Sequence, residues 1–375
     1  MTVTIEPAES RAQIEEFIRF PFGLYRDEPH WVPPLLMERR DFLNPKKNPV
    51  YEYSRLQLLL ARQDRRVVGT IAAIRNDRYG QFHEAERNVG FFGLYECIDS
   101  PEVSHALLGA AAAWLAEQGF GVMRGPVNVT TNDVLGLLVE GFDDDPALLM
   151  PYNPRYYEAQ LESFGLRKSK DLLAFEAIPD QCVGKLDAIA EKLLERGRCT
   201  LRPVNLSRFH EELEFVRRCY NEAWKDNWGF VPWTDRELEF LAKELKPLID
   251  PRLTFVGEIG GEPAAISISI PDANEGLKLA RGRLFPFGLL KLLWRVKVRG
   301  CDRVRTAALG VLPQHRRLGL EAVMIQRSVR SSYEIGFARA EMGWILEDNE
   351  PMLRALQRIT VRRSKVFRIY DRPLS

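Results

Sequence analysis

The amino-acid sequence predicts an α/β (α+β) protein of two halves, each a mixed, mostly antiparallel sheet flanked by helices. The chain has 375 residues, more than a single hydrophobic core usually serves, so two domains are expected. Apolar segments of strand length alternate with segments of helical periodicity. The same order of hairpin, strand, helix and strand occurs twice, and the pattern breaks near residue 180.

The composition is that of a folded, soluble protein. Hydrophobic residues make up 45% of the chain and charged residues 28%, and 53 Lys and Arg nearly balance 52 Asp and Glu. This balance gives no support for a nucleic-acid partner. The five cysteines include no C-x-x-C pair, so neither a disulfide framework nor a metal site is expected. The acidic start and the lack of a membrane-length apolar run predict a cytoplasmic protein.

The first half has a hairpin, a third strand, a fourth strand and a closing strand. Its best-defined strand-like segments are 53–61, 67–74, 89–98 and 171–178. Two helices are expected at 103–118 and 155–164, because each of these segments stops at a glycine, Gly119 or Gly165.

The second half repeats this order. Its strand-like segments are 253–259, 262–270, 303–311, 340–346 and 365–371. Helices are expected at 320–334 and 350–358, between the later strands. The repeated order places two domains at 1–180 and 181–375 and suggests a duplication.

The segment 304–321, VRTAALGVLPQHRRLGLE, carries the clearest chemical signal. An apolar strand ends at Pro313, and a basic, glycine-containing turn then opens a helix. Backbone N–H groups and the positive end of the helix dipole meet in such a turn, and Gly319 permits a close approach. With the charges of Arg316 and Arg317, the turn can hold a pyrophosphate, although a turn with solvated arginines has the same spacing.

This segment resembles motif A of the GNAT N-acyltransferases, Q/R-x-x-G-x-G/A, in which Arg316 and Gly319 match while Glu321 stands at the final Gly/Ala position. Residues 344–352 resemble motif B, and 367–374 resemble the usual last strand. The resemblance implies acyl-CoA or acetyl-CoA as donor substrate, and no metal. The residues it implies for donor binding are Val311, Gln314, His315, Arg316, Arg317, Leu318, Gly319, Leu320, Glu321 and Asn349.

The first half also resembles a GNAT domain, at 150–166, MPYNPRYYEAQLESFGL. The turn after its third strand is acidic, with Asp99 and Glu102, and should repel a pyrophosphate. We therefore expect residues 1–180 to form a degenerate GNAT-like domain that shapes the acceptor site, and residues 181–375 to bind acyl-CoA.

Several longer segments, among them FFGLYECID, RGPVNVTTND and GLLVEGFDDDP, resemble a group of bacterial tandem GNAT-like proteins over most of the chain. Some members are implicated in ceramide synthesis, which implies transfer of a fatty acyl group to a long-chain amine such as a sphingoid base. The implied acceptor is a small-molecule or lipid amine. Acetylation of a small polar amine, and transfer from an aminoacyl donor, are the rival reactions within the same class.

N-acyl transfer requires a deprotonated amine and a polarised thioester carbonyl. Glu347, at the end of the motif B strand, is the first candidate for the base. Glu96, on the third strand, is the second, with a structural buried acid as the alternative. Tyr156 and Tyr157 are adjacent on a helix, so at most one should line the cleft while the other packs. We assign Tyr157 to catalysis, and Tyr156 and Asn153 to acceptor binding.

The segment 221–232, NEAWKDNWGFVP, concentrates aromatic and amide side chains. Asn221, Trp224 and Trp228 are candidates for a pocket wall that binds the acceptor. Structural packing explains the tryptophans equally well.

The segment 281–299 holds six basic residues and no acid, with Leu289, Leu292, Leu293 and Val296 at helical spacing. Such a helix suits peripheral contact with the inner face of an anionic membrane. The alternative is a helix that packs its leucine stripe on the domain core.

A second hypothesis keeps the fold without the chemistry. Because Glu321 departs from motif A, the chain is alternatively a degenerate GNAT that binds acyl-CoA or lipid without catalysis. Release of CoA that depends on an amine distinguishes the enzyme from this binding protein.

Overall fold

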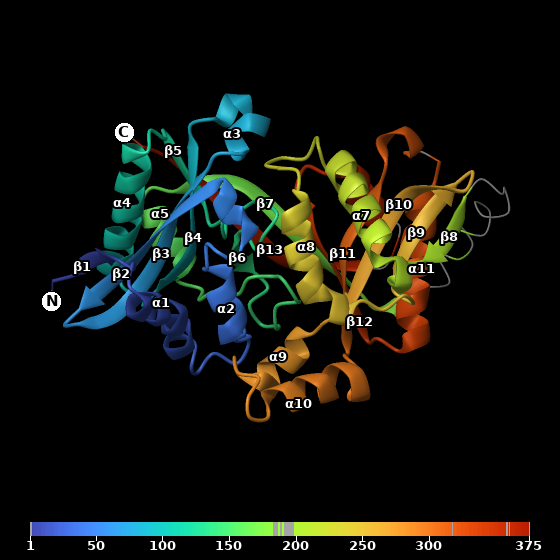
Figure 1. Ribbon diagram of the computed structural model, residues 1–375, viewed down its shortest axis with the longest axis horizontal. Coiled ribbons are helices and arrows are strands. Elements are labelled where there is room, and N and C mark those ends of the chain that lie inside the picture. Colours follow the sequence, from blue (N-terminus) through green and yellow to red (C-terminus); the bar gives the residue numbers. More distant parts are fainter. Residues whose placement is uncertain are drawn as a thin grey trace. The chain divides into compact units, whose positions relative to one another are not determined.

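The computed structural model describes residues 2–182, 187, 190, 199–316, 318–357, 359 and 361–374. The chain divides into two compact units (Figure 1). Unit 1 consists of Met1–Leu172, Leu277–Leu289 and Lys365–Ser375, and unit 2 of Leu173–Gly276 and Leu290–Ser364. One cut near residue 180 does not describe this division, because two later segments return to unit 1.

Unit 1 is built on strands in the order β1-β2-β3-β4-β5-β13, with β6 paired to β13. Its strands are β1 (Thr4–Pro7), β2 (Ser54–Gln63), β3 (Arg66–Asn76), β4 (Val89–Cys97), β5 (Val122–Gly125), β6 (Leu137–Glu140) and the later part of β13 (Val361–Pro373). Its helices are α1 (Arg11–Leu24), α2 (Leu36–Phe42), α3 (Tyr79–Phe82), α4 (Pro101–Glu117) and α5 (Tyr157–Ser163).

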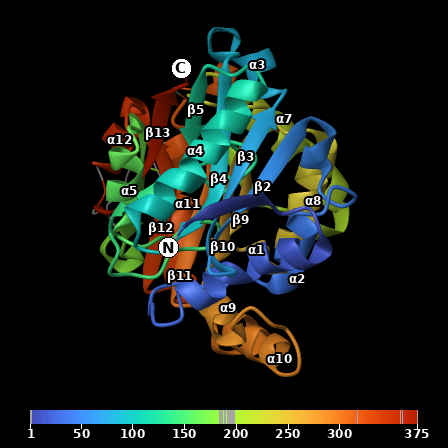
Figure 2. The ribbon, with the colours of Figure 1, turned by 90° about the vertical axis from the view of Figure 1, so that its left-hand side faces the viewer.

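The sheet of unit 1 is covered on both faces by helices. Figure 2 shows α4 lying across β2, β3 and β4, where Leu107 and Ala111 pack on Ile71 and Ala73. Side chains alternate between the faces of a strand, so Thr70 lies on the opposite face, where it shares a pocket with Phe17 of α1. The helix α1 begins with a capping box at Ser10.

Unit 2 repeats the arrangement with strands in the order β12-β11-β10-β9-β8. Its strands are β8 (Thr200–Pro203), β9 (Thr254–Ile259), β10 (Glu262–Pro271), β11 (Arg303–Val311) and β12 (Arg339–Leu346). Its helices are α7 (Phe209–Ala223), α8 (Asp235–Leu245), α11 (Leu320–Ile335) and α12 (Glu350–Leu356). The strand β7 (Arg167–Ala177) and the helices α9 (Asn274–Ala280) and α10 (Gly288–Leu293) lie where the chain passes from one unit to the other.

In the described part of unit 2, α11 and α7 pack on the sheet. Val323 and Met324 of α11 pack with Phe255 and Ala265 in one apolar cluster. Phe215 and Cys219 of α7 pack with Val256 and Ile266 in a second. Because Phe255 and Val256 are neighbours on β9, the two clusters lie on opposite faces of the strand.

The pairings described in each unit include one parallel pair of strands beside antiparallel pairs. The parallel pairs are β4 with β5 in unit 1 and β11 with β12 in unit 2. In each unit the helix that connects the parallel strands, α4 or α11, packs on the sheet. The expected fold class, a mixed and mostly antiparallel sheet flanked by helices in each half, is confirmed.

Candidate functional site

The parallel strands of unit 2 separate toward their carboxyl ends. In β11 and β12 the first pair of partners is Arg303 with Arg339, and the last is Thr306 with Met342. Just beyond, β11 carries a bulge opposite Ile268 and Ser269 of β10. Beyond the last pair, Ala307–Val311 and Gly343–Leu346 line a groove of about 560 Å³ with residues of α11 and α12. A groove of this size between two strands can take an extended ligand.

Most of the groove is apolar. Its side chains include Leu309, Ile325, Val329, Met352 and Leu356. Four residues expected to hold the donor line it, namely Val311, Arg316, Glu321 and Asn349. Gln314, His315, Leu318, Gly319 and Leu320 do not line it, and Arg317 lies outside the described residues.

The turn before α11 has the backbone geometry expected of an anion site. Gly319 is the N-cap and has φ +86°, a conformation that favours glycine. No side chain of the described residues caps this end of the helix. Leu320 is fully buried in the core beside Gly257, so its side chain is structural. The Ala322 N–H donates to the Gly319 carbonyl at 3.1 Å, so among the described residues of the first turn the N–H groups of Leu320 and Glu321, with the helix dipole, remain for a ligand.

Arg316 has a partner within unit 2. Its Nη2 donates to the carbonyl oxygen of Ala223, the last residue of α7, at 2.6 Å. A cation at a helix C-terminus is favourable, so Arg316 also fixes the end of α7 to the turn. The next residue, Trp224, lines the groove and packs so closely on Gly310 that an added Cβ would lie 2.3 Å from its ring.

The remaining candidates of unit 2 are placed differently. Asn221 accepts from the Trp233 backbone N–H at 3.0 Å and donates to its carbonyl at 3.1 Å, so it braces a loop. Asn349 caps α12, accepting from the Met352 N–H at 3.3 Å. Glu347 and Trp228 are partly buried and do not line the groove.

The corresponding position of unit 1 is closed by its own chain. The parallel pairing of β4 with β5 begins with Val89 opposite Val122 and ends with Phe91 opposite Arg124. The next segment then fills the gap: Val127 donates to the Phe92 carbonyl at 2.8 Å, and Asn128 Oδ1 accepts from the Leu94 N–H at 2.8 Å. An extended ligand cannot reach the β4 backbone there.

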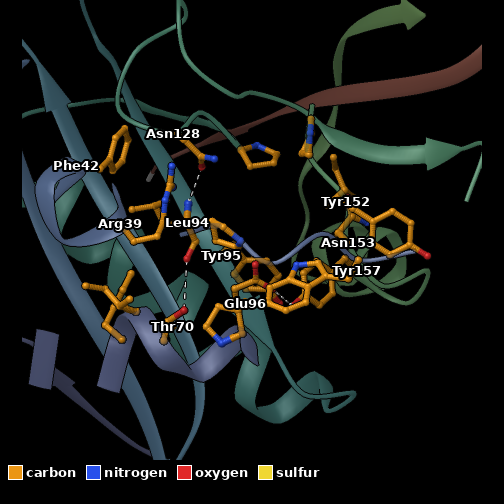
Figure 3. A pocket seen from close by; sticks show the side chains of 18 of the residues that line it. Arg39, Phe42, Thr70, Leu94, Tyr95, Glu96, Asn128, Tyr152, Asn153 and Tyr157 are labelled. Carbon is orange, nitrogen blue, oxygen red and sulfur yellow. Dashed lines mark hydrogen bonds between the residues drawn. The ribbon is translucent and has the colours of Figure 1, made fainter. Parts of the chain in front are cut away.

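Unit 1 instead contains a smaller pocket, of about 170 Å³, beside β4 (Figure 3). Glu96 lies in it and is partly buried. Its Oε2 accepts from the hydroxyl of Tyr25 at 2.7 Å and from that of Tyr157 at 2.8 Å. Its Oε1 has no hydrogen-bond partner within the described part of the chain. One oxygen is thus anchored by two phenols, and the other is available to accept a proton.

Loss of hydration in this pocket raises the pKa of Glu96 to about 7, and the hydrogen bonds from Tyr25 and Tyr157 oppose the rise. A carboxyl group with a pKa near neutrality can take and release a proton at physiological pH. Burial raises the pKa of both tyrosines well above the ordinary value, so they remain hydrogen-bond donors.

Of the paired tyrosines, Tyr157 lines the pocket, whereas Tyr156, assigned above to acceptor binding, does not. Tyr157 contacts Glu96, whereas the Tyr156 hydroxyl donates to the Cys97 carbonyl at 2.8 Å. Asn153 lines the pocket, but its amide braces β6 through both backbone groups of Leu138. The sequence analysis named Glu96 and Tyr157 as candidates. It did not predict that a third residue would hydrogen-bond Glu96.

Tyr25 and Trp31 are the residues that sequence reasoning missed. Tyr25 is buried and stacks on Trp31, with ring centroids 4.8 Å apart and planes 7° apart. Both lie in the aromatic-rich segment that includes α1, which carries no recognisable motif. The partner of Tyr25, Glu96, is 71 positions away, so only the fold brings them together.

Comparison with known proteins identifies the family. The chain is 36% identical over 379 residues to a bacterial ceramide synthase of Caulobacter vibrioides, covering 99% of this chain and 98% of that protein. The chain belongs to the bacterial ceramide synthase family. The chain is also 36% identical to Protein YghO of Escherichia coli (strain K12), over 97% of this chain and 94% of that protein. No protein-family model matches.

Several solved structures resemble this chain in fold. A tandem GNAT protein from the clavulanic acid biosynthesis pathway covers 100% of this chain and 99% of its own, with a TM-score of 0.57 and 11% identity. A GCN5-related N-acetyltransferase from Sphaerobacter thermophilus covers 99% and 96%, with a TM-score of 0.54 and 11% identity. The chain therefore has the fold of a tandem GNAT protein, and as a member of its family it is an acyltransferase.

None of the described helices is long and apolar enough to cross a membrane. The described residues contain no group of three or more His, Cys, Asp or Glu side chains that could hold a metal ion.

Proposed function

We propose that this N-acyltransferase uses acyl-CoA as donor and a long-chain amine, such as a sphingoid base, as acceptor. The observation that carries the proposal is the contrast between the units. The strands of unit 2 separate around an apolar groove, whereas the matching strands of unit 1 are closed by Val127 and Asn128. The donor is therefore assigned to unit 2, and unit 1 is a degenerate domain that serves the acceptor.

In the donor groove, backbone groups of β11 and β12 beyond their last pair can hydrogen-bond the amides of a pantetheine arm, as an added strand would. The uncapped start of α11 and Arg316 suit a pyrophosphate. Glu321 also lines the groove, so we assign it to the rim away from the phosphates. The apolar side chains suit a hydrocarbon chain on the thioester.

In unit 1, Glu96 is proposed as the base. An amine is mostly an ammonium at neutral pH, and it must lose one proton to Glu96 before its lone pair can attack. The new C–N bond then forms at the thioester carbonyl as the C–S bond breaks, and the thiolate leaves with the second N–H proton as a thiol. Tyr25 and Tyr157 hold the carboxylate in place. Glu347, outside the groove, becomes the second candidate.

The residues that meet the acceptor are proposed within the same pocket, which is bordered by Trp31, Pro34, Phe42 and Leu43. Arg39 also lines the pocket, but its guanidinium is paired with Glu38 at 2.6 Å. An otherwise largely apolar rim beside the Glu96 carboxylate suits an ammonium attached to a hydrocarbon chain. Because such an amine partitions into lipid, we place the enzyme in the cytoplasm, at the periphery of the inner membrane face.

The test is a CoA-release assay with purified protein. Acetyl-, octanoyl- and palmitoyl-CoA are each supplied with and without a sphingoid base, and binding is followed by thermal shift. Palmitoyl-CoA should stabilise the protein, and release should require the base. Preference for acetyl-CoA would move the acceptor to a small amine, and stabilisation without release would favour a binding protein. No response to any thioester would refute the donor assignment.

A second test compares a substitution in the turn before α11 with a matched control substitution on α12. Arg316→Gln should raise KM for the acyl-CoA about tenfold, because one charge-assisted contact with phosphate is lost. Arg354→Gln, which removes an exposed cation of α12 paired with Glu350, should leave KM unchanged. Equal KM values for the two variants would exclude Arg316 from donor binding.

A further inference from the structure

Eight of the 13 exposed large hydrophobic side chains among the described residues lie between Leu279 and Val298. They are Leu279, Phe285, Phe287, Leu289, Leu290, Leu293, Trp294 and Val298. Phe285 is 79% exposed and Val298 75%. Single exposed apolar residues are ordinary, but this concentration within one short segment marks an interaction surface. We call residues 279–299 the 279–299 surface.

The helix at the centre of this surface is apolar on both sides. α10 continues into a π-helical turn, Trp294–Arg299. Leu292 and Val296 face α9, since a Cβ added to Gly276 would lie 2.7 Å and 3.1 Å from them. The expected leucine stripe is thus only partly packed on the protein: Leu293 is exposed, with Leu290 and Trp294 spaced four residues apart beside it. This outer face has no cover within the described chain.

The charge of the 279–299 surface has one sign. No acidic residue occurs from Gly276 to Cys301. Its exposed cations are Arg281, Arg283, Lys291, Lys297 and Arg299. Arg295 is the exception, because it is buried and paired with Glu275 and Asp302, where it anchors the helical segment. Uncovered apolar side chains among exposed cations are complementary to an anionic lipid surface.

We propose that the 279–299 surface docks on an anionic phospholipid bilayer. Phe285, Phe287, Leu290 and Trp294 enter the boundary between head groups and acyl chains, and the exposed cations remain at the phosphates. A second copy of the chain is a poorer occupant, because a two-fold contact would bring the same cations together. No residue of this surface lines the groove or the pocket, so the proposal stands apart from the acyl-transfer chemistry.

The experiment is cosedimentation of the full-length protein with vesicles. Binding to phosphatidylglycerol-containing vesicles should exceed binding to pure phosphatidylcholine and should weaken with salt. The double variant Phe285→Ser/Phe287→Ser should bind about tenfold more weakly. Lys291→Gln and Arg299→Gln should each weaken binding about fivefold. The matched control is Phe82→Ser, on α3, which removes an aromatic side chain that is 50% exposed and should change nothing.

Three outcomes would overturn the proposal: no vesicle binding by the unmodified protein, equal loss in the Phe82 control, or a solution dimer that Phe285→Ser/Phe287→Ser dissociates. CoA release is measured in parallel with substrates that are soluble as monomers. Variants of the 279–299 surface should keep this rate. If the unmodified protein binds vesicles but releases no CoA, the docking surface survives and the proposed reaction fails.

Discussion

Glu96 makes the folded protein less stable when it is ionised. Its pKa rises from the ordinary 4.5 to about 7, so the folded chain binds this proton more tightly than the unfolded chain does. The stabilisation from this proton is complete below about pH 4.5 and is lost as the pH rises through about 7. The difference amounts to about 3 kcal/mol of unfolding free energy, an upper limit because the pocket can rehydrate.

Replacing the carboxylate should therefore stabilise the protein only at high pH. We expect Glu96→Gln to raise the unfolding free energy by about 1–3 kcal/mol at pH 8 and to leave it nearly unchanged at pH 4.5. Denaturant unfolding at both pH values measures this. The same variant should lose most N-acyl transfer. A variant that is no more stable at pH 8 than the unmodified protein would show that Glu96 is well hydrated.

The two phenols should set where activity appears on the pH scale. The rate of CoA release should increase as the pH rises through about 7, where Glu96 ionises; we call this rise the acidic limb of the pH–rate profile. Tyr25→Phe removes a hydrogen bond that favours the charged carboxylate, so the limb should move upward by roughly half to one pH unit. Tyr156→Phe loses a bond to the Cys97 carbonyl instead and should leave the limb in place. Identical shifts in both variants would contradict this account.

Among elements, the contact that closes unit 1 is the most sensitive to added volume. A Cβ on Gly93 of β4 would lie 2.1 Å from the Val127 carbonyl oxygen, a backbone atom that cannot move alone. Gly93→Ala should cost about 3 kcal/mol or more. Gly109→Ala, in the middle of α4, meets only Phe164 at 4.0 Å and should stabilise by about 0.5–1 kcal/mol. In thermal unfolding, Gly93→Ala should lower the Tm relative to the unmodified protein and Gly109→Ala should raise it.

Elements were predictable where one local pattern decides them. The hairpin β2–β3, the helix α4 and the strand β11 follow from apolar spacing and glycine stops, and the expected and observed bounds of β11 coincide at Arg303–Val311. The spacing of apolar residues along a segment does not indicate which sheet the strand joins. The strand at 365–371 reads as the last strand of the second half, yet its residues pair with β5 and β6 of unit 1.

The candidate site was predictable in part for the same reason. Glu96 and Tyr157 were found because a carboxylate on a strand and a tyrosine on a helix are conspicuous in sequence. Tyr25 completes their network from a helix end with no motif, and no pattern within a short window reports a contact across 71 positions. The glycine turn at Gly319 was recognisable because its backbone geometry depends on the residues themselves.

At the scale of the molecule, unit 1 depends on residues at the far end of the sequence. Phe367, Ile369 and Tyr370 of β13 are fully buried. Asp371 forms an ion pair with Arg124 of β5 at 2.7 Å. A chain that stops at Ser364 should therefore lose the cooperative unfolding of unit 1, while unit 2 retains its helices. Hydrogen exchange that remains slow throughout 54–97 in the shortened chain would disprove this dependence.

The position of β13 also bears on how the protein is made. A ribosome releases a chain from its N-terminus, and domains usually fold in the order in which they emerge. Here the first unit cannot close its sheet until residues 365–373 have left the exit tunnel. During most of synthesis β5 and β6 lack this neighbour, so the nascent chain exposes strand edges that chaperones must shield from pairing with other chains.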